Sequence, residues 1–535
     1  MVCSVDHLAS SAGVAMLRSG GNAVDAAIAC SAVLSVTTQH LCGMGGDLFA
    51  LVSLPGSPAP AVLNASGRAG SGASAERLRA EGFTAVPRTG HISAVPVPGC
   101  VDGWVALHSR FGSLPLSTLL APARSYASDG FPISPLLAAS ARRALAPLAA
   151  AGSDGVADYP TGPALRAGAL MRRPGVARTL AAIASAGRAG FYEGEFGEGL
   201  LALGDGEYTA DDLSSPLADW VDGLSLAIPS WGRTLWTVPP NSQGYLTLAS
   251  AWIASGLPLP SDPTDPLWPH LLIEASRAAG YDRVSVLHEH ADGPSLVALD
   301  RLATRRSLVS ADAAAVGLGD GPYLGGGTIY LCTADGSGMG VSLIQSNYSG
   351  FGSMLVVPGV RIFLQNRGHG FSLVPGHPAE YGPRRRPPHT LSPALVTRTD
   401  DGSLDCVLGT MGGDSQPQIL LQLLARRYGA GVAGGASGPA DAESPASALA
   451  AGRWVLAGTE TGYDIWSGGR GQVRVAVEGH APPSWLPGLS ALGHDAFPSP
   501  AWSADFGHAH MIAFSDGLLS GAADPRALGG AAVGY

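Results

Sequence analysis

The residue whose position points most directly to chemistry is Thr328. It follows three glycines, Gly325 to Gly327, and opens the run TIYLCTA, which is typical of a strand. Glycine gives the preceding backbone conformations that other residues cannot adopt, so that the hydroxyl could attack the peptide bond just before it. Cleavage there would give Thr328 a free α-amine. With a pKa of about 7.7–8.0, that amine can act as the base for the threonine's own hydroxyl.

Two alternatives stand beside this hypothesis. Thr328 could be an ordinary strand residue after a glycine-rich loop, since β-branched residues are common in strands. Cys332, four residues later and on the same face of the strand, is a rival nucleophile. The threonine mechanism needs no lysine, and all 32 basic residues here are arginine. A lysine Schiff base and a P-loop lysine are therefore excluded.

Composition narrows the class of protein further. The 535 residues are 46% hydrophobic and 14% charged, and the net charge is −10, so we do not expect a nucleic-acid partner. The sequence shows neither a signal-peptide pattern nor an apolar run of about 18 residues, so we expect no membrane span. Six scattered cysteines favour reduced thiols and a cytoplasmic location.

The elements that must position Thr328 follow from periodicity and turn signals. A helix is predicted over 10–18, ended by Gly20, and a second, buried helix runs from the cap Asn22 to residue 36. Helical patterns dominate from 103 to 203. From 328 to 373 strand-like runs alternate with turns, and Asp335-Gly336 predicts a hairpin. A helical first half is thus followed by a strand-dense second half.

Ordered segments along nearly the whole chain resemble the γ-glutamyltransferase (γ-glutamyltranspeptidase) family. They are LASSAGVAMLRSGGNAVDAAIACSAVLSV at 8–36, QHLCGMGGDLFALV at 39–52, PPNSQGYLTL at 239–248 and TIYLCTADGSGMGVSLIQSNYSGFGS from Thr328. The resemblance implies an α+β fold, the αββα four-layer sandwich of N-terminal-nucleophile hydrolases. It also implies a zymogen that cleaves itself before Thr328 into a large subunit, 1–327, and a small subunit, 328–535. The two would stay together as one intertwined catalytic domain, a heterodimer that could pair again into a dimer of heterodimers.

The resemblance also assigns roles within the site. Thr328 aligns with the family's nucleophile, and Ser346 with the threonine that hydrogen-bonds that nucleophile. Gly412 and Gly413, in GTMGGD, align with the glycine pair whose N–H groups stabilise the oxyanion. The mechanism that the resemblance implies uses no metal and no organic cofactor.

The family's γ-glutamyl pocket does not carry over. Its L-D-x-R-E motif reads Leu63-Asn64-Ala65-Ser66-Gly67-Arg68, so that Ser66 stands where an arginine clamps the substrate's α-carboxylate. Losing such charge partners costs on the order of 2–5 kcal/mol of recognition. The replacements resemble a divergent cytosolic, γ-glutamyltransferase-like branch. The candidates for a reshaped substrate pocket are Arg68, Tyr348, Arg367, His369, His389 and Thr390.

We therefore expect an N-terminal threonine hydrolase or acyltransferase that acts on γ-glutamyl-type or related acyl amides through an acyl-enzyme. One alternative is hydrolysis of a carbon–carbon bond in antibiotic biosynthesis, by analogy with homologues that make alkylproline units. Another is a catalytically dead binding homologue. The pairs His288/His290 and His508/His510 lack a third ligand at a defined spacing, so we expect no metal site. GMGGD is not a dinucleotide-binding fingerprint.

Overall fold

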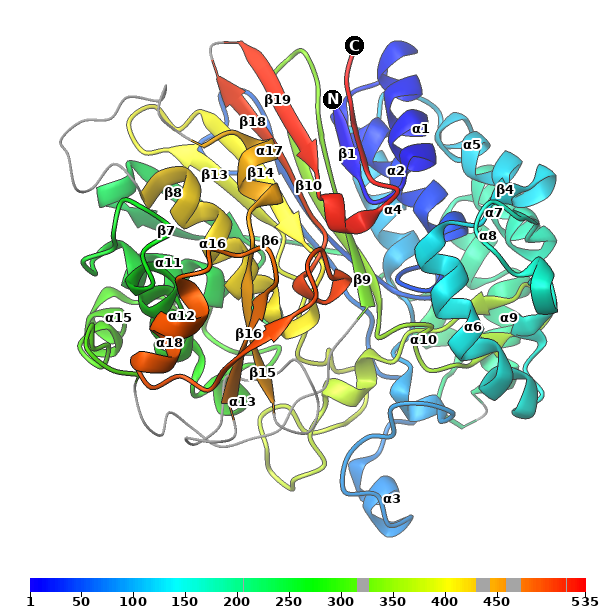
Figure 1. Cartoon of the computed structure of the whole chain (residues 1–535). Helices are drawn as coiled ribbons and strands as arrows, with labels where there is room; N and C mark the ends of the chain where they lie inside the picture. The colour runs from blue at the N-terminus through cyan, green and yellow to red at the C-terminus, as the bar shows by residue number, and fades with distance from the viewer. Residues whose placement is uncertain (205, 315–326, 430–442, 459–472, 516) are drawn as a thin grey trace.

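The computed structural model describes residues 1–204, 206–314, 327–429, 443–458, 473–515 and 517–535, and two large antiparallel sheets lie at its centre (Figure 1). The first sheet contains, in spatial order, β20 (Ala531–Val533), β1 (Val2–Ser4), β9 (Gly327–Ala334), β10 (Gly340–Tyr348), β2 (Asp47–Ser53), β3 (Ala61–Ala65) and β6 (Asp219–Val221). The second contains β19 (Leu518–Ala523), β18 (Ala509–Ser515), β14 (Leu404–Thr410), β13 (Ala394–Arg398), β8 (Arg233–Thr237) and β7 (Leu224–Ile228). The α+β prediction is confirmed.

Apolar side chains form a separate core on each face of these sheets. Phe49, Tyr330 and Ile344 of the first sheet meet Leu395 and Val407 of the second in a cluster between the two. Because successive strand residues point to opposite faces, Leu48 and Leu331 instead face a helical layer. That layer contains α1 (His7–Arg18), α2 (Ala23–Thr37), α4 (Cys100–Phe111), α5 (Leu116–Asp129), α6 (Pro135–Ala150) and α7 (Pro174–Ala186).

The second sheet has helices of its own on the far side, drawn at the left of Figure 1. They are α11 (Tyr245–Ser255), α12 (Leu267–Gly280), α15 (Leu299–Arg306), α16 (Gln416–Tyr428), α17 (Pro445–Ala450) and α18 (Trp485–Ala491). Beside them lies a small sheet of β15 (Trp454–Gly458), β16 (Val473–Glu478) and β17 (Ala496–Ser499). No helix among the described residues combines the length and the apolar composition that crossing a membrane requires.

The predicted local elements are confirmed where the signals are strong. Asn22 caps α2 in a capping box with Asp25, whose side chain accepts from the N–H of Asn22 at 3.0 Å. β9 and β10 form the predicted hairpin, although its turn spans residues 335–339 rather than two residues. Asp335 closes this loop by accepting from the N–H of Ser337 at 2.9 Å.

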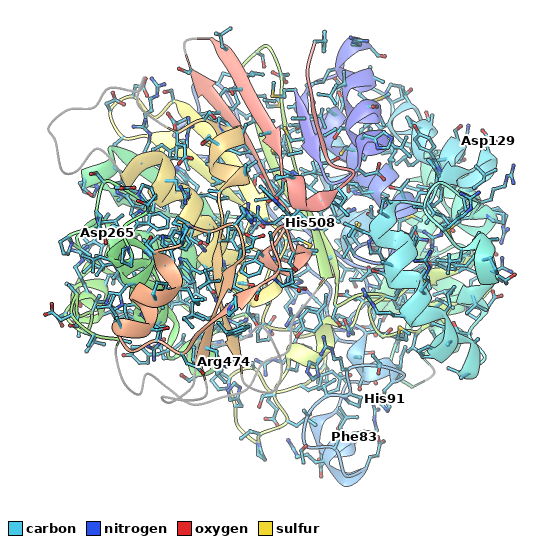
Figure 2. All side chains as sticks on the ribbon, viewed as in Figure 1. Phe83, His91, Asp129, Asp265, Arg474 and His508 are labelled. Carbon is cyan, nitrogen blue, oxygen red and sulfur yellow. The ribbon has the colours of Figure 1, made fainter. Side chains whose placement is uncertain are left out.

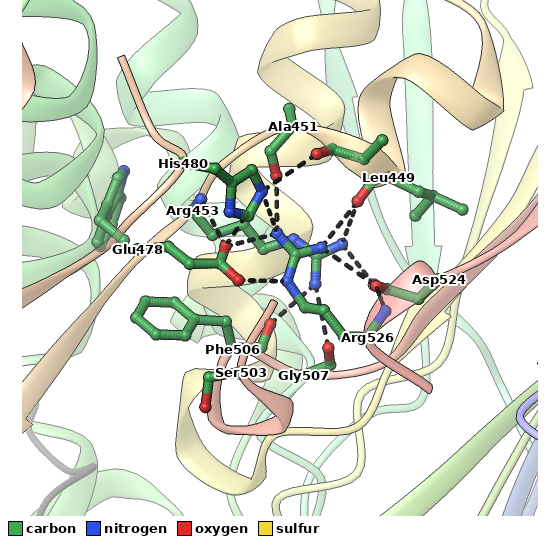
Figure 3. A network of polar contacts seen from close by, with 12 residues as sticks. Leu449, Ala451, Arg453, Glu478, His480, Ser503, Phe506, Gly507, Asp524 and Arg526 are labelled. Carbon is green, nitrogen blue, oxygen red and sulfur yellow. Dashed lines mark hydrogen bonds and ion pairs between the residues drawn. The ribbon is translucent and has the colours of Figure 1, made fainter. Parts of the chain in front are cut away.

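A buried network of charges joins the small sheet to the C-terminal segment (Figure 3). Arg526 contacts Glu478 at 2.5 Å, and Arg453 contacts Asp524 at 2.6 Å. Arg453 also donates to the carbonyl of Phe506 at 2.8 Å and so anchors the loop around it. The next residue after that loop is His508, which lies near the middle of the molecule (Figure 2). Its backbone carbonyl accepts from the N–H of Met411 at 3.1 Å. The network therefore supports the segment that precedes Gly412.

We expect Asp524→Asn to destabilise the chain by about 3–5 kcal/mol, because two buried guanidinium groups lose one of their carboxylates. Differential scanning calorimetry of the variant and of the unchanged chain would measure the loss. Asp495→Asn is the matched control: its partner Arg474 is 3.0 Å away, but the pair is exposed and should contribute no more than about 1 kcal/mol.

The same carboxylate predicts a pH dependence. Burial alone would raise the pKa of Asp524, but Arg453 and Arg526 outweigh it and lower this pKa to about 2 from the ordinary 3.8. Its contribution to stability is therefore complete above about pH 4 and is lost as the pH falls from about 4 to about 2. In Asp524→Asn the melting temperature should depend less on pH between about pH 4 and about pH 2. The same pH dependence as in the unchanged chain would contradict the role given to Asp524.

Candidate active site

Thr328 is buried at the start of β9, and its hydroxyl lies 2.9 Å from that of Ser346. The Ser346 hydroxyl also contacts the carbonyl oxygen of Gly327 at 2.6 Å and the N–H of Tyr348 at 2.8 Å. A carbonyl can only accept and an N–H can only donate, so the single proton of Ser346 points to Gly327. Thr328 must then donate its own proton to Ser346. The two hydroxyls and the peptide bond before Thr328 thus form one directed chain of hydrogen bonds.

A bulge in the sheet makes this arrangement possible. β10 pairs with β9 in register up to Gln345 opposite Ile329, and the register then shifts so that Tyr348 stands opposite Gly327. Tyr348 takes a φ of 75°, which costs a non-glycine residue free energy and is typical of functional sites. The shift turns the N–H of Tyr348 back onto the Ser346 hydroxyl.

A cavity of about 520 Å³ opens next to this bond, and both Gly327 and Gly412 line it. Gly412 has a φ of 139°, a conformation that residues with a Cβ rarely adopt. Within the described part of the chain we find no hydrogen bond from the N–H of Gly412 or of Gly413. Gly413 follows in a short 3-10 turn, and its carbonyl accepts from Gln243 at 3.1 Å. Among the described residues, the N–H of Gly412 is therefore left free in the wall of the cavity that Gly327 also lines.

Asp47 fixes the surroundings of Ser346. The two residues lie opposite each other in the pairing of β2 and β10. Its buried carboxylate accepts from the N–H of Gly67 at 2.7 Å, from Gln365 at 2.8 Å and from His389 Nε2 at 3.0 Å. Sequence reasoning missed this residue. The only signal was its place between the glycine cluster 43–46 and a strand.

Four of the six predicted pocket residues come together in the structure. The Arg367 guanidinium lies 3.8 Å from the centre of the Tyr348 ring and donates to the Thr390 hydroxyl at 3.2 Å. Thr390 follows His389. Arg367 is buried, has no ion pair with any described carboxylate, and its Nε has no hydrogen-bond partner among the described residues.

Both ring nitrogens of His389 are already engaged. Its Nε2 contacts Asp47, and its Nδ1 accepts from the N–H of Leu391 at 3.3 Å, which fixes the neutral tautomer with the proton on Nε2. Burial lowers the pKa of His389 to about 4, against the opposing effect of Asp47. His389 therefore orients Asp47 and leaves no ring nitrogen for a ligand.

The remaining two predicted residues are held differently. His369 donates from Nδ1 to the carbonyl of Val86 at 2.6 Å and lies beside the Tyr348 ring, while burial lowers its pKa. Arg68 is half-exposed and is committed to Asp219 at 3.3 Å and Glu289 at 3.4 Å. Arg68 is thus held by acidic side chains and not by the residues that contact Arg367.

Two alternatives from the sequence gain no support. Cys332 is fully buried, and burial raises the pKa of its thiol well above the usual value, which keeps it protonated and a poor nucleophile. In the part of the chain that the structure describes, no three or more histidine, cysteine or acidic side chains gather as metal ligands would. His508 and His510 lie next to the Asp524 network instead, and burial lowers their pKa values to about 4 and about 3.

Comparison with known proteins places this site in a family. Residues 9–534 match the family model described as γ-glutamyltranspeptidase. The chain is 36% identical to an oxamate amidohydrolase proenzyme of Klebsiella pneumoniae and 34% identical to the glutathione hydrolase-like YwrD proenzyme of Bacillus subtilis, each across 100% of this chain and 98% of the relative. A crystal structure of a cephalosporin acylase from Bacillus halodurans superposes with a TM-score of 0.84 at 33% identity, covering 98% of this chain and 94% of that one.

These matches define the chain as a hydrolase proenzyme, so the prediction of an enzyme is confirmed and a catalytically dead homologue is set aside. The chain belongs to the γ-glutamyltranspeptidase family. Two of the relatives are named as proenzymes, which implies that the chain cleaves itself into subunits.

We expect Ser346→Ala to slow self-cleavage by about 10²–10³-fold, because the carbonyl of Gly327 loses its hydrogen-bond donor and Thr328 loses its acceptor. A denaturing-gel time course of freshly purified protein would measure the rate. Ser346→Thr keeps the hydroxyl and should restore cleavage, whereas Ser342→Ala is the matched control on the same strand and face. Cleavage of Ser346→Ala at the wild-type rate would contradict the hydrogen-bond chain.

Proposed function

We propose that this chain is a self-processing amidohydrolase or acyltransferase whose nucleophile is Thr328. The observation that carries the proposal is the directed set of hydrogen bonds from Thr328 through Ser346 to the Gly327 carbonyl. A hydroxyl is held beside the amide that it would attack, and the carbonyl of that amide already receives a donor. In the same cavity wall, Gly412 offers a backbone N–H.

Self-cleavage would follow from this geometry. The Thr328 oxygen attacks the carbonyl carbon of Gly327, and the Ser346 proton stabilises the charge that develops on the carbonyl oxygen. The C–N bond breaks, the Thr328 hydroxyl proton ends on the departing nitrogen, and an ester joins residues 327 and 328. Water then hydrolyses the ester and leaves a carboxylate on Gly327 and a free α-amine on Thr328.

Turnover would use the amine that self-cleavage exposes. That amine accepts the hydroxyl proton as Thr328 attacks a substrate amide, and it returns the proton to the leaving nitrogen. Gly412 and Gly413 would stabilise the oxyanion. The acyl-enzyme would then pass to water or to an amine. The names of two relatives, an oxamate amidohydrolase and a glutathione hydrolase-like protein, support an amide as the substrate.

The pocket around Arg367 supports a substrate other than a simple γ-glutamyl compound. In the position of the family's clamping arginine stands Ser66, which is buried and hydrogen-bonded to Asn64 at 2.8 Å. Arg367 is buried, with Tyr348 and Thr390 beside it, and Tyr348 stands opposite Gly327 in the pairing of β9 and β10. We propose that these side chains form the reshaped pocket.

The finer features of the sequence prediction belong to the same proposal. Apolar clusters on both outer faces of the two sheets and a third cluster between them support an αββα four-layer arrangement. Cleavage before residue 328 of 535 would give subunits of 327 and 208 residues. We propose that the pair works as a heterodimer in the cytoplasm.

We expect purified wild-type protein to show two bands on a denaturing gel, and Thr328→Ala a single band of 54.0 kDa, because the alanine removes the attacking oxygen. Thr328→Ser keeps that oxygen and should still be cleaved. Edman sequencing of the smaller band should begin Thr-Ile-Tyr. A wild-type chain that stays in one piece, or a small subunit with another first residue, would overturn the proposal.

A substrate assay tests the pocket separately. With γ-glutamyl-p-nitroanilide we expect a kcat/KM at least about tenfold below that for the best neutral acyl p-nitroanilide, since the clamping arginine is absent. Thr328→Ala is the inactive control. Dominant turnover of the γ-glutamyl compound would contradict the reshaped pocket. Cleaved protein that is inactive on every amide would favour the carbon–carbon alternative.

A further inference from the structure

A second cavity lies behind the catalytic one, and the two share a wall. Its volume is about 350 Å³, in the range of small-molecule sites, and it is lined by the start of α1, by residues 132–136 and 167–168 and by residues 527–529. Its lining residues His7, Gly168 and Leu528 are exposed, so this cavity also opens to solvent. His40 and Leu41 line both this cavity and the one beside Gly327. The two cavities therefore share these two residues, and we call the second one the inner chamber because it reaches the buried His40.

The backbone that carries the dividing side chains is fixed. The turn after α2 is closed by the N–H of Leu41 donating to the carbonyl of Thr38 at 2.8 Å. The carbonyl of Leu41 accepts from the N–H of Asn347 at 3.1 Å, one residue after Ser346. Gln39 is tied to the Tyr159 hydroxyl at 3.0 Å. The backbone of His40 and Leu41 is therefore fixed. A change in the shape of the wall between the two cavities has to come from their side chains.

His40 is a buried polar group without a role in the fold. Neither ring nitrogen has a hydrogen-bond partner among the described residues, although an unpaired buried polar group costs about 1–3 kcal/mol. Burial lowers the pKa of His40 to about 3, so the ring is neutral and offers one donor and one acceptor. Such a group, exposed to two cavities, is suited to contact a ligand.

The walls of the inner chamber are otherwise apolar or satisfied. Val5, Leu8, Ile133, Leu136 and Leu528 supply its apolar surface. Asp6 accepts from the N–H of Leu8 at 2.9 Å, Thr38 donates to the carbonyl of Leu34 at 2.7 Å, and Ser134 caps α6 by accepting from Leu137 at 3.1 Å. Among the described lining residues, the one other polar side chain besides His40 is His7, which is exposed and lies 3.6 Å from the Asp6 carboxylate. A ligand segment that enters this chamber would find apolar contacts beyond His40.

The scissile amide indicates which part of a substrate faces this wall. Gly327 is the acyl residue of the bond that Thr328 would cleave. A Cβ on Gly327 would meet the backbone of Gly350 first, at 2.7 Å, and the carbonyl oxygen of His40 next, at 3.6 Å. The acyl side of the reaction centre thus lies between the Gly350 turn and the His40 turn. We propose, resting on the function above, that the substrates are amides of acyl groups with an alkyl or aryl tail, which passes His40 and Leu41 and occupies the inner chamber.

A chain-length series tests the proposal on the cleaved enzyme. From acetyl to octanoyl p-nitroanilide we expect kcat/KM to rise at least about tenfold, because each buried methylene contributes up to about fourfold. Leu136→Trp, which fills the chamber, should lower the octanoyl-to-acetyl ratio at least about tenfold. His40→Ala, which widens the passage, should raise that ratio. Leu145→Trp, on the same helix α6 but outside both cavities, is the matched control.

A binding measurement separates this inference from the proposed function. Titration calorimetry of octanoate, the acyl product, into the cleaved enzyme needs no turnover and should show binding that Leu136→Trp weakens at least about tenfold. A flat chain-length series, an equal effect of Leu145→Trp, or dependence on the length of the amine instead of the acyl group would overturn the inference. Loss of self-cleavage or of all amide hydrolysis would instead overturn the proposed function.

Discussion

A carboxylate in the middle of a protein must be supplied with donors, and Asp47 draws its donors from three separate segments. Gly67 follows β3, Gln365 lies 318 residues away from Asp47 in the chain, and His389 lies 342 residues away. Removing any one of them would leave a buried charge partly uncompensated, which costs far more than an ordinary hydrogen bond. Because Asp47 stands opposite Ser346 across β2 and β10, these segments are held in a fixed position relative to Thr328.

The groups that hydrogen-bond the Thr328 and Ser346 hydroxyls are neutral, whereas Arg88, Arg143 and Asp505 line the cavity beside Gly327. His40 and His389 are neutral at physiological pH because burial disfavours their charged forms. The nearby cation Arg367 rests on the ring of Tyr348. In such surroundings a newly exposed α-amine would face little competition as a base. In the proposed mechanism a chain without lysine would still have a base, because cleavage would supply the α-amine of Thr328.

The sequence was informative wherever a signal is local. The helices α1 and α2 follow from periodicity and from the cap at Asn22, and the β9–β10 hairpin follows from strand runs around Asp335. Thr328, Ser346 and the two glycines came from motif resemblance. Asp47 and His40 could not be recognised, because their importance depends on partners or cavities formed by distant segments. The bulge that turns Tyr348 toward Ser346 likewise has no local signature. Arg68 stays a prediction, and its ion pairs with Asp219 and Glu289 join segments too distant in the chain to be read from sequence.

The order of strands in the first sheet has a consequence for a chain that has been cut. The two ends of the polypeptide meet there, since β20 pairs with β1 and β1 in turn pairs with β9 (Figure 1). Strands from the two sides of the cut therefore alternate in the sheet. β20, β9 and β10 belong to the segment after the cut, whereas β1, between β20 and β9, and β2, next to β10, belong to the segment before it. Two fragments interleaved in this way cannot slide apart as intact bodies. Their separation would require the sheet to unravel, so the nicked molecule would persist as one particle whose halves do not exchange with those of its neighbours.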